Sequence, residues 1–149
     1  MIATGVRPRS HESLPQLKEW AITSDDLFSL KEAPGKTLVI GGGYIAIECA
    51  GFLRSLNTEV ILANRSSFLR VFDHDMAAKV ENQLEEEGIR LLKNTTILSV
   101  IKLEDKLFEV TLQIGKTTET LQVNTLLMAI GRDPNPEAFG AQKAGLALD

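Results

Sequence analysis

The sequence has a single cysteine among its 149 residues, no long apolar run and no excess of positive charge. One cysteine excludes an internal disulfide framework and any dithiol chemistry within this chain. No apolar stretch approaches the roughly 18 residues of a membrane span, and no signal-peptide pattern precedes the first predicted strand. The net charge of −4 argues against a general nucleic-acid or membrane-surface binder. We therefore expect a cytoplasmic globular domain, with the mitochondrion as the alternative compartment.

The segment from Lys36 to Gly51 has the pattern of a buried strand, a glycine turn and a helix. Residues 38–40 form an unbroken apolar run, which is typical of a central parallel strand covered on both faces. After the turn, apolar residues recur at helical spacing and predict one buried stripe, made of Ile45, Cys49, Phe52 and Leu56. On this stripe Cys49 is expected to be a small buried hydrophobe rather than a nucleophile.

Three small residues in this segment, Gly41, Gly43 and Ala46, match the pattern G-x-G-x-x-G/A. In that pattern the first glycine allows a sharp turn, the second lets a pyrophosphate approach the backbone, and the third small residue lets helix and strand pack closely. The phosphates would bind N–H groups at the positive end of the helix dipole. The alternative interpretation is that these glycines serve packing alone.

The residues after the second predicted strand, 59–63, indicate which dinucleotide would bind. Asn64 lies near the ~20-residue offset at which an NAD-binding unit carries an acid for the ribose hydroxyl. Here the acid is replaced by a basic and hydroxylic segment containing Asn64, Arg65, Ser66, Ser67 and Arg70. A guanidinium forms charge-assisted bonds to a phosphate of roughly 1.5–3 kcal/mol each, whereas a carboxylate would repel it. The segment therefore predicts a preference for NADPH over NADH.

The remainder of the chain completes an α/β pattern. Asp73 is predicted to cap a helix that ends at Gly88, with an inner face of Met76, Val80 and Leu84 and with His74 on the surface. A third parallel strand at 89–92 places the nucleotide at the carboxyl edge of the sheet. Alternating segments then predict antiparallel strands and a final buried strand, at 97–103, 107–114, 118–123 and 125–131. The predicted fold is a Rossmann-like three-layer α/β nucleotide-binding domain with a parallel sheet and a small antiparallel β-meander crossover.

Both ends of the chain carry a similar strand ending. The run from Ile2 to Gly5 is followed by an arginine and a proline, as is the run from Met128 to Gly131. Two such endings suggest two crossings into a neighbouring domain. We therefore divide the chain into an entry strand and connection (1–35), a nucleotide-binding domain (36–131) and an exit segment (132–149). Within the entry connection, Ser24 is predicted to cap a helix whose first turn carries Asp25 and Asp26 for the helix dipole.

These motifs resemble the pyridine nucleotide-disulfide oxidoreductases, and within them the large thioredoxin reductases and thioredoxin-glutathione reductases. The resemblance covers almost the whole chain. The spacing from Arg65 to Arg70 is similar to that of thioredoxin reductases, whereas the segment 41–46 is more similar to glutathione reductases. NADH-using lipoamide dehydrogenases of the family carry an acid where this chain has Asn64. The terminal disulfide substrate therefore stays open.

The resemblance implies roles for individual residues. Tyr44 would gate the nicotinamide pocket over the flavin, and Glu48 would pair with a lysine of an FAD domain. Their structural alternatives are a packed ring with a solvated hydroxyl and an ordinary solvated carboxylate. Arg65 and Arg70 would hold the 2′-phosphate. The full expected cofactor-binding set is Gly41, Gly43, Tyr44, Ile45, Ala46, Glu48, Asn64, Arg65, Ser66, Arg70, Ile130 and Gly131.

The resemblance also implies a larger parent. The chain lacks the family's FAD fingerprint, redox-active cysteine pair, carboxyl-terminal flavin segment, and interface domain with its acid/base histidine. The implied parent is a homodimer that passes hydride from NADPH to FAD, then reduces an enzyme disulfide and finally thioredoxin or a similar disulfide. We expect this chain to bind NADPH, without a metal and without completing that reaction. The alternatives are a glutathione reductase-type parent and a non-catalytic nucleotide-sensing or interaction module.

Overall fold

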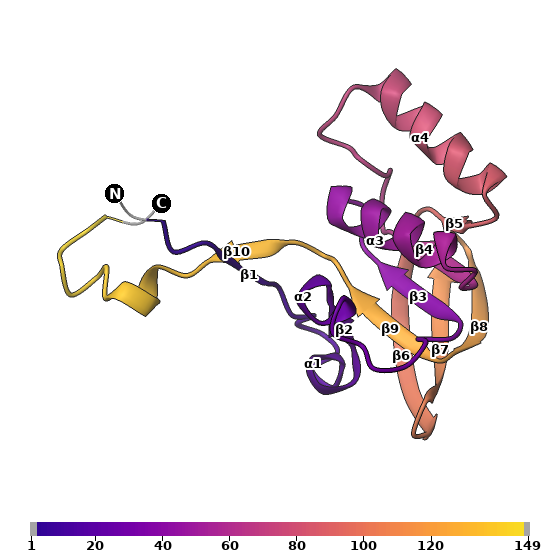
Figure 1. The fold of residues 1–149 in the computed structure, drawn as a ribbon, viewed down its shortest axis with the longest axis horizontal. Helices are drawn as coiled ribbons and strands as arrows, with labels where there is room; N and C mark the ends of the chain where they lie inside the picture. Colours follow the sequence, from indigo (N-terminus) through magenta and orange to yellow (C-terminus); the bar gives the residue numbers. More distant parts are fainter. Residues whose placement is uncertain (1–2, 148–149) are drawn as a thin grey trace.

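The computed structural model describes residues 3–147, and its central layer is a five-stranded parallel sheet (Figure 1). In spatial order the strands are β2 (Ile22–Thr23), β9 (Thr125–Met128), β3 (Thr37–Ile40), β4 (Val60–Ala63) and β5 (Arg90–Leu92). All neighbouring strands pair in parallel. Every residue of β3 and β4 is buried. This burial follows from their continuous apolar runs, which suit strands covered on both faces.

Two helices cover one face of this sheet, and Figure 1 shows both of them there. They are α3 (Tyr44–Ser55) and α4 (His74–Glu86), and Asp73 caps α4 as predicted. Because successive side chains of a strand point to opposite faces, Val39, Leu62 and Leu127 all face the helices. They form one core cluster with buried residues of both helices and of the loop between β4 and α4. These residues include Ala46, Cys49, Ala50, Leu53, Phe68 and Leu84.

An antiparallel sheet covers the opposite face. Its strands are β6 (Thr95–Glu104), β7 (Leu107–Ile114) and β8 (Thr117–Val123). Leu38, Ile40 and Leu126 point toward it and pack with its buried side chains, among them Val100, Phe108, Val110, Leu112, Leu121 and Val123. The predicted fold class is therefore confirmed: a three-layer α/β arrangement in which a β-meander forms the crossover between β5 and β9.

The predicted inner faces of both helices are partly wrong. In α3 the buried residues are Ala46, Cys49, Ala50 and Leu53, whereas Phe52 and Leu56 are 38% and 60% exposed. In α4, Met76 is 57% exposed and Ala77 is buried. Small alanines let a helix approach the sheet closely, so they occupy the line of contact while larger apolar residues lie beside it. Cys49 is buried, as expected.

A two-stranded arm projects away from the three layers (Figure 1). Its strands, β1 (Val6–Pro8) and β10 (Arg132–Pro134), pair antiparallel, and the 3-10 helix η1 (Pro136–Phe139) follows them. The entry strand was predicted at 1–5. Residues 1 and 2 lie outside the described residues, and residues 3–5 have no regular secondary structure. The observed strand begins at Val6, just after the predicted end, because its partner is the segment after Gly131.

Between the arm and β3 lie two short helices, α1 (Leu17–Trp20) and α2 (Ser24–Leu27). The predicted N-cap of α2, Ser24, is wrong by one residue. Thr23 is the N-cap and forms a reciprocal capping box with Asp26. The predicted strand 125–131 is shorter than expected and ends at Met128. Among residues 3–147, no helix combines the length and apolar character required to cross a membrane.

Candidate functional site

The carboxyl ends of three parallel strands meet at one edge of the sheet. From β3 the chain passes through α3 to β4 on one side, while β9 lies on the other side of β3. Ligands of open α/β sheets bind at such a switch point. The strand ends are joined tightly, because the Ala129 amide donates to the Ile40 carbonyl (2.8 Å) and the Gly41 amide donates to the Ala63 carbonyl (2.9 Å).

The three consecutive glycines at this edge have different reasons to be glycine. Gly41 has a φ of +143°, and a Cβ there would overlap the Ala129 carbonyl. A Cβ on Gly42 would overlap the side-chain amide of Asn64. A Cβ on Gly43 would meet no atom within 4 Å, and its extended backbone (φ −87°, ψ 176°) suits any residue. Packing thus explains Gly41 and Gly42, whereas Gly43 leaves open space above the turn.

Gly43 is also the N-cap of α3. Among the described residues, none caps this end of the helix through a side chain. The first N–H groups of a helix have no intrahelical acceptor, so those of α3 are available to an external one. Tyr44 is 56% exposed, Glu48 is exposed one turn later, Ile45 is half-buried, and Ala46 is fully buried against the sheet. This end of α3 therefore fits an anion, as a pyridine nucleotide diphosphate would require.

The loop after β4 is bonded directly to the glycine turn. The Leu69 amide donates to the Gly42 carbonyl at 2.7 Å, and Phe68 is 1% exposed in the core beneath the helices. Arg65 and Arg70 are exposed at the two ends of this loop, and neither forms an ion pair with any residue from 3 to 147. The structure thus brings the arginine-bearing loop next to the glycine turn, although 22 or more residues separate them in sequence.

The segment after β9 lies at the same edge but is partly occupied by other contacts. Ile130 is half-buried and packs against the core. Gly131 has a φ of +131°, and its carbonyl accepts a bond from the Arg9 amide at 2.9 Å. Of the two predicted cofactor-lining residues, Gly131 is the exposed one.

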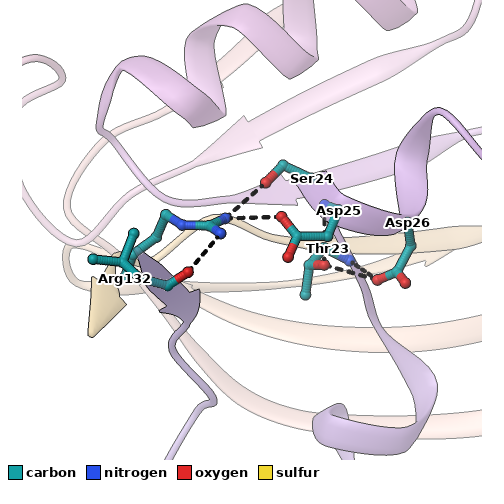
Figure 2. Close-up of polar contacts among 6 residues, drawn as sticks. Thr23, Ser24, Asp25, Asp26 and Arg132 are labelled. Carbon is teal, nitrogen blue, oxygen red and sulfur yellow. Dashed lines mark hydrogen bonds and ion pairs between the residues drawn. The ribbon is translucent and has the colours of Figure 1, made fainter. Parts of the chain in front are cut away.

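Arg132 fastens the arm to α2, a role that the sequence interpretation missed. Its guanidinium donates to the Asp25 carboxylate (2.9 Å) and the Ser24 hydroxyl (3.4 Å), as Figure 2 shows. It also donates to the Val6 carbonyl (3.0 Å). Asp25 therefore serves an ion pair as well as the dipole of α2. The arginine that recurs in both strand endings was the only available signal for this joint.

A second bond holds the two strands of the arm together. The Nε atom of Arg9 donates to both carboxylate oxygens of Asp133, at 3.0 and 3.1 Å. This hydrogen bond, together with the opposite charge, holds the pKa of Asp133 below its usual range and raises the pKa of Arg9.

Acidification is expected to loosen the arm before the core. An acid whose pKa is lowered by folding stabilises the fold above its unfolded pKa of about 3.9, and this contribution is lost as pH falls through the lower folded value. The hydrogen-exchange protection factor of the Arg9 amide should therefore fall below about pH 4 while core amides stay protected. Asp133→Asn should show low protection at neutral pH. Equal protection in this variant and the unchanged chain would contradict the prediction.

The described residues contain no group of three or more side chains that could hold a metal ion. The carboxyl edge offers a helix end without a side-chain cap, an open glycine and, on an attached loop, two arginines without an ion-pair partner within residues 3–147.

Comparisons with known proteins show which proteins this chain is similar to. A family model described as pyridine nucleotide-disulphide oxidoreductase matches residues 1–149. Thioredoxin reductases of Plasmodium falciparum isolates FCH-5 and 3D7 are 44% identical to this chain over 149 residues, which is 100% of the chain and 27% and 24% of those proteins. The Cu(II) complex of the HOCl-induced flavoprotein disulfide reductase RclA from Escherichia coli has a TM-score of 0.84 at 26% identity, covering 99% of this chain and 33% of that one.

The chain thus spans roughly a quarter of the length of these thioredoxin reductases. Members of the matched family generally use a flavin and a nicotinamide cofactor. Because the family model matches every residue, this chain belongs to the pyridine nucleotide-disulphide oxidoreductase family.

Proposed function

We propose that this chain is the NADPH-binding domain of a flavoprotein disulfide reductase. The observation that carries the proposal is the 2.7 Å bond from the Leu69 amide to the Gly42 carbonyl, because it joins the arginine loop to the glycine turn. One dinucleotide can then reach both features. Its diphosphate would bind the free N–H groups at the start of α3, and its 2′-phosphate would bind Arg65, Arg70 and the Ser66 hydroxyl.

The remaining site residues fit roles around the nicotinamide, which when bound supplies a hydride. Tyr44 is exposed where α3 begins, so its ring can move without disrupting the core, as a gate over the nicotinamide pocket requires. Glu48 lies one turn further on and has no partner within residues 3–147, which leaves it available to a lysine of an FAD domain. Gly131 would line the path of the cofactor.

The arm supports the assignment of connections to an FAD domain within residues 1–35 and 132–149, although β2, within the first range, belongs to the central sheet. Because β1 and β10 pair with each other, the chain enters and leaves the three layers side by side, as an inserted domain must. The parent would pass hydride from NADPH to FAD, then reduce an enzyme disulfide and finally thioredoxin, and it would be a homodimer with an interface domain. The 44% identity to thioredoxin reductases favours this parent over a glutathione reductase-type one.

Titration with the two dinucleotides tests the proposal. The purified chain should bind NADPH more tightly than NADH, because only NADPH presents a phosphate to Arg65 and Arg70. We expect about a 30-fold or larger difference at low ionic strength, and a smaller one as salt screens the exposed arginines. Calorimetry of 2′,5′-ADP against 5′-AMP isolates the same phosphate. Equal affinities within each pair would contradict an NADPH domain.

A further inference from the structure

The side chain of Asn64 makes contacts that only a hydrogen-bond donor can make. Its Nδ2 atom faces three oxygens, the Ser67 carbonyl (2.8 Å), the Ser66 carbonyl (3.3 Å) and the Ser66 hydroxyl (3.4 Å). An amide NH₂ supplies two protons for these acceptors. An ionised carboxylate has none and would place negative charge against two carbonyl dipoles. NAD-binding units carry an acid near position 64, but the oxygens that surround the side chain here require a hydrogen-bond donor such as an amide.

Asn64 is itself held in place by the sheet. Its backbone amide donates to the Leu92 carbonyl, and its backbone carbonyl accepts from the Thr95 backbone amide, both at 2.9 Å. Its side chain lies directly over Gly42, where a Cβ would overlap it. Asn64 therefore links the β4 end, the glycine turn and the following loop.

The loop beyond Asn64 adopts a conformation that needs such support. Leu69 has a φ of +48°, a left-handed backbone that a leucine adopts only where surrounding contacts enforce it. Three contacts do so here. The Asn64 side-chain amide donates to the Ser67 carbonyl, the Phe68 ring is buried in the core, and the Leu69 backbone amide donates to the Gly42 carbonyl. Arg65 follows the first of these anchors and Arg70 follows the last.

We propose that Asn64 is a positioning residue that presets the 64–70 loop so that Arg65 and Arg70 meet a 2′-phosphate without reordering. The proposal rests on the NADPH-binding function proposed above. Preordering raises affinity because binding then costs less conformational freedom. An acid at position 64 would consequently not create an NADH-binding domain. It would release the loop that carries both arginines.

The test compares Asn64→Ala and Asn64→Asp with the unchanged 149-residue chain. Without ligand, both variants should lose about tenfold or more of the hydrogen-exchange protection at the Leu69 amide, because one or more hydrogen bonds holding the loop are removed. The preference for 2′,5′-ADP over 5′-AMP should fall by about tenfold or more, while 5′-AMP affinity stays within about threefold. Asn64→Ala introduces no charge, so its result separates loop order from direct repulsion of the ligand. Ser66→Ala keeps the carbonyl acceptors of the Asn64 side chain, so it should change the hydrogen-exchange protection at the Leu69 amide by less than about threefold.

The outcomes distinguish a failure of the Asn64 positioning role from a failure of the proposed NADPH-binding function. Unchanged Leu69 protection in Asn64→Ala would overturn the positioning role, whatever the nucleotide results. Lost protection with an unchanged preference would overturn the link between the loop and phosphate recognition. If the unchanged chain itself binds 2′,5′-ADP no better than 5′-AMP, the proposed function fails, and Asn64 is then only a structural clamp.

Discussion

Replacing Gly43 with valine is expected to reduce the binding of NADPH and NADH alike by about 100-fold or more. The valine would fill the open space above the glycine turn, where a diphosphate must approach the backbone. Two charge-assisted bonds to the diphosphate, at roughly 1.5–3 kcal/mol each, would be lost. The fold should survive, because a Cβ at this position meets no protein atom and the backbone is extended. Thermal unfolding should show a loss of about 1 kcal/mol at most, from the poorer N-cap.

Two matched variants separate this effect from damage to the fold. Gly51→Ala lies on the same helix, where a Cβ also meets no atom within 4 Å. It should retain nucleotide binding and gain about 0.5–1 kcal/mol of stability, because alanine favours a helix over glycine. Gly41→Val should unfold the domain, since its side chain would strike the Ala129 carbonyl. If Gly43→Val bound both nucleotides normally, the diphosphate site would lie elsewhere.

The strands and their order of appearance could be predicted from the sequence because the signals are local. The apolar run before Gly41 and the alternation within 97–123 each specify a strand type without reference to distant residues. The helix faces were predicted less well. Apolar size pointed to Phe52 and Met76, but close approach to a sheet selects small residues, and a periodic pattern does not reveal how near the sheet will be.

The sequence predicted which residues belong to the candidate site, but it predicted only some of the contacts that these residues make. The spacing of Gly41 and Gly43 located the turn, yet it gave no reason for Gly42, whose constraint is the side chain of Asn64. Asn64 was interpreted as a missing acid, while its contacts are those of a donor to its own loop. Arg132 was missed because its partners lie more than 100 residues away in sequence. Such long-range pairs depend on which chain ends the fold brings together.

Replacing both Arg65 and Arg70 with alanine should weaken NADPH binding strongly while leaving NADH binding nearly unchanged. Both guanidinium groups are exposed and have no ion-pair partner among residues 3–147, so their removal leaves no buried charge behind. Because exposed charges are screened, we take the lower end of the expected range, roughly 2–3 kcal/mol for the pair. This corresponds to a loss of about 30- to 150-fold for NADPH. The ratio of the two dissociation constants, measured by fluorescence titration or calorimetry, is the deciding quantity.

The double variant Lys18→Ala/Lys31→Ala provides the control, since it removes the same net charge at the opposite edge of the sheet. Both lysines are exposed and precede the amino ends of β2 and β3. If the arginines acted only through the overall field of the domain, the lysine variant would weaken NADPH binding to a similar degree. If they contact the 2′-phosphate, the lysine variant keeps the preference and the arginine variant loses it. An equal loss of NADPH and NADH binding in the arginine variant would instead indicate a disturbed loop and would contradict their proposed role. The two double variants together therefore distinguish a local phosphate contact from long-range attraction.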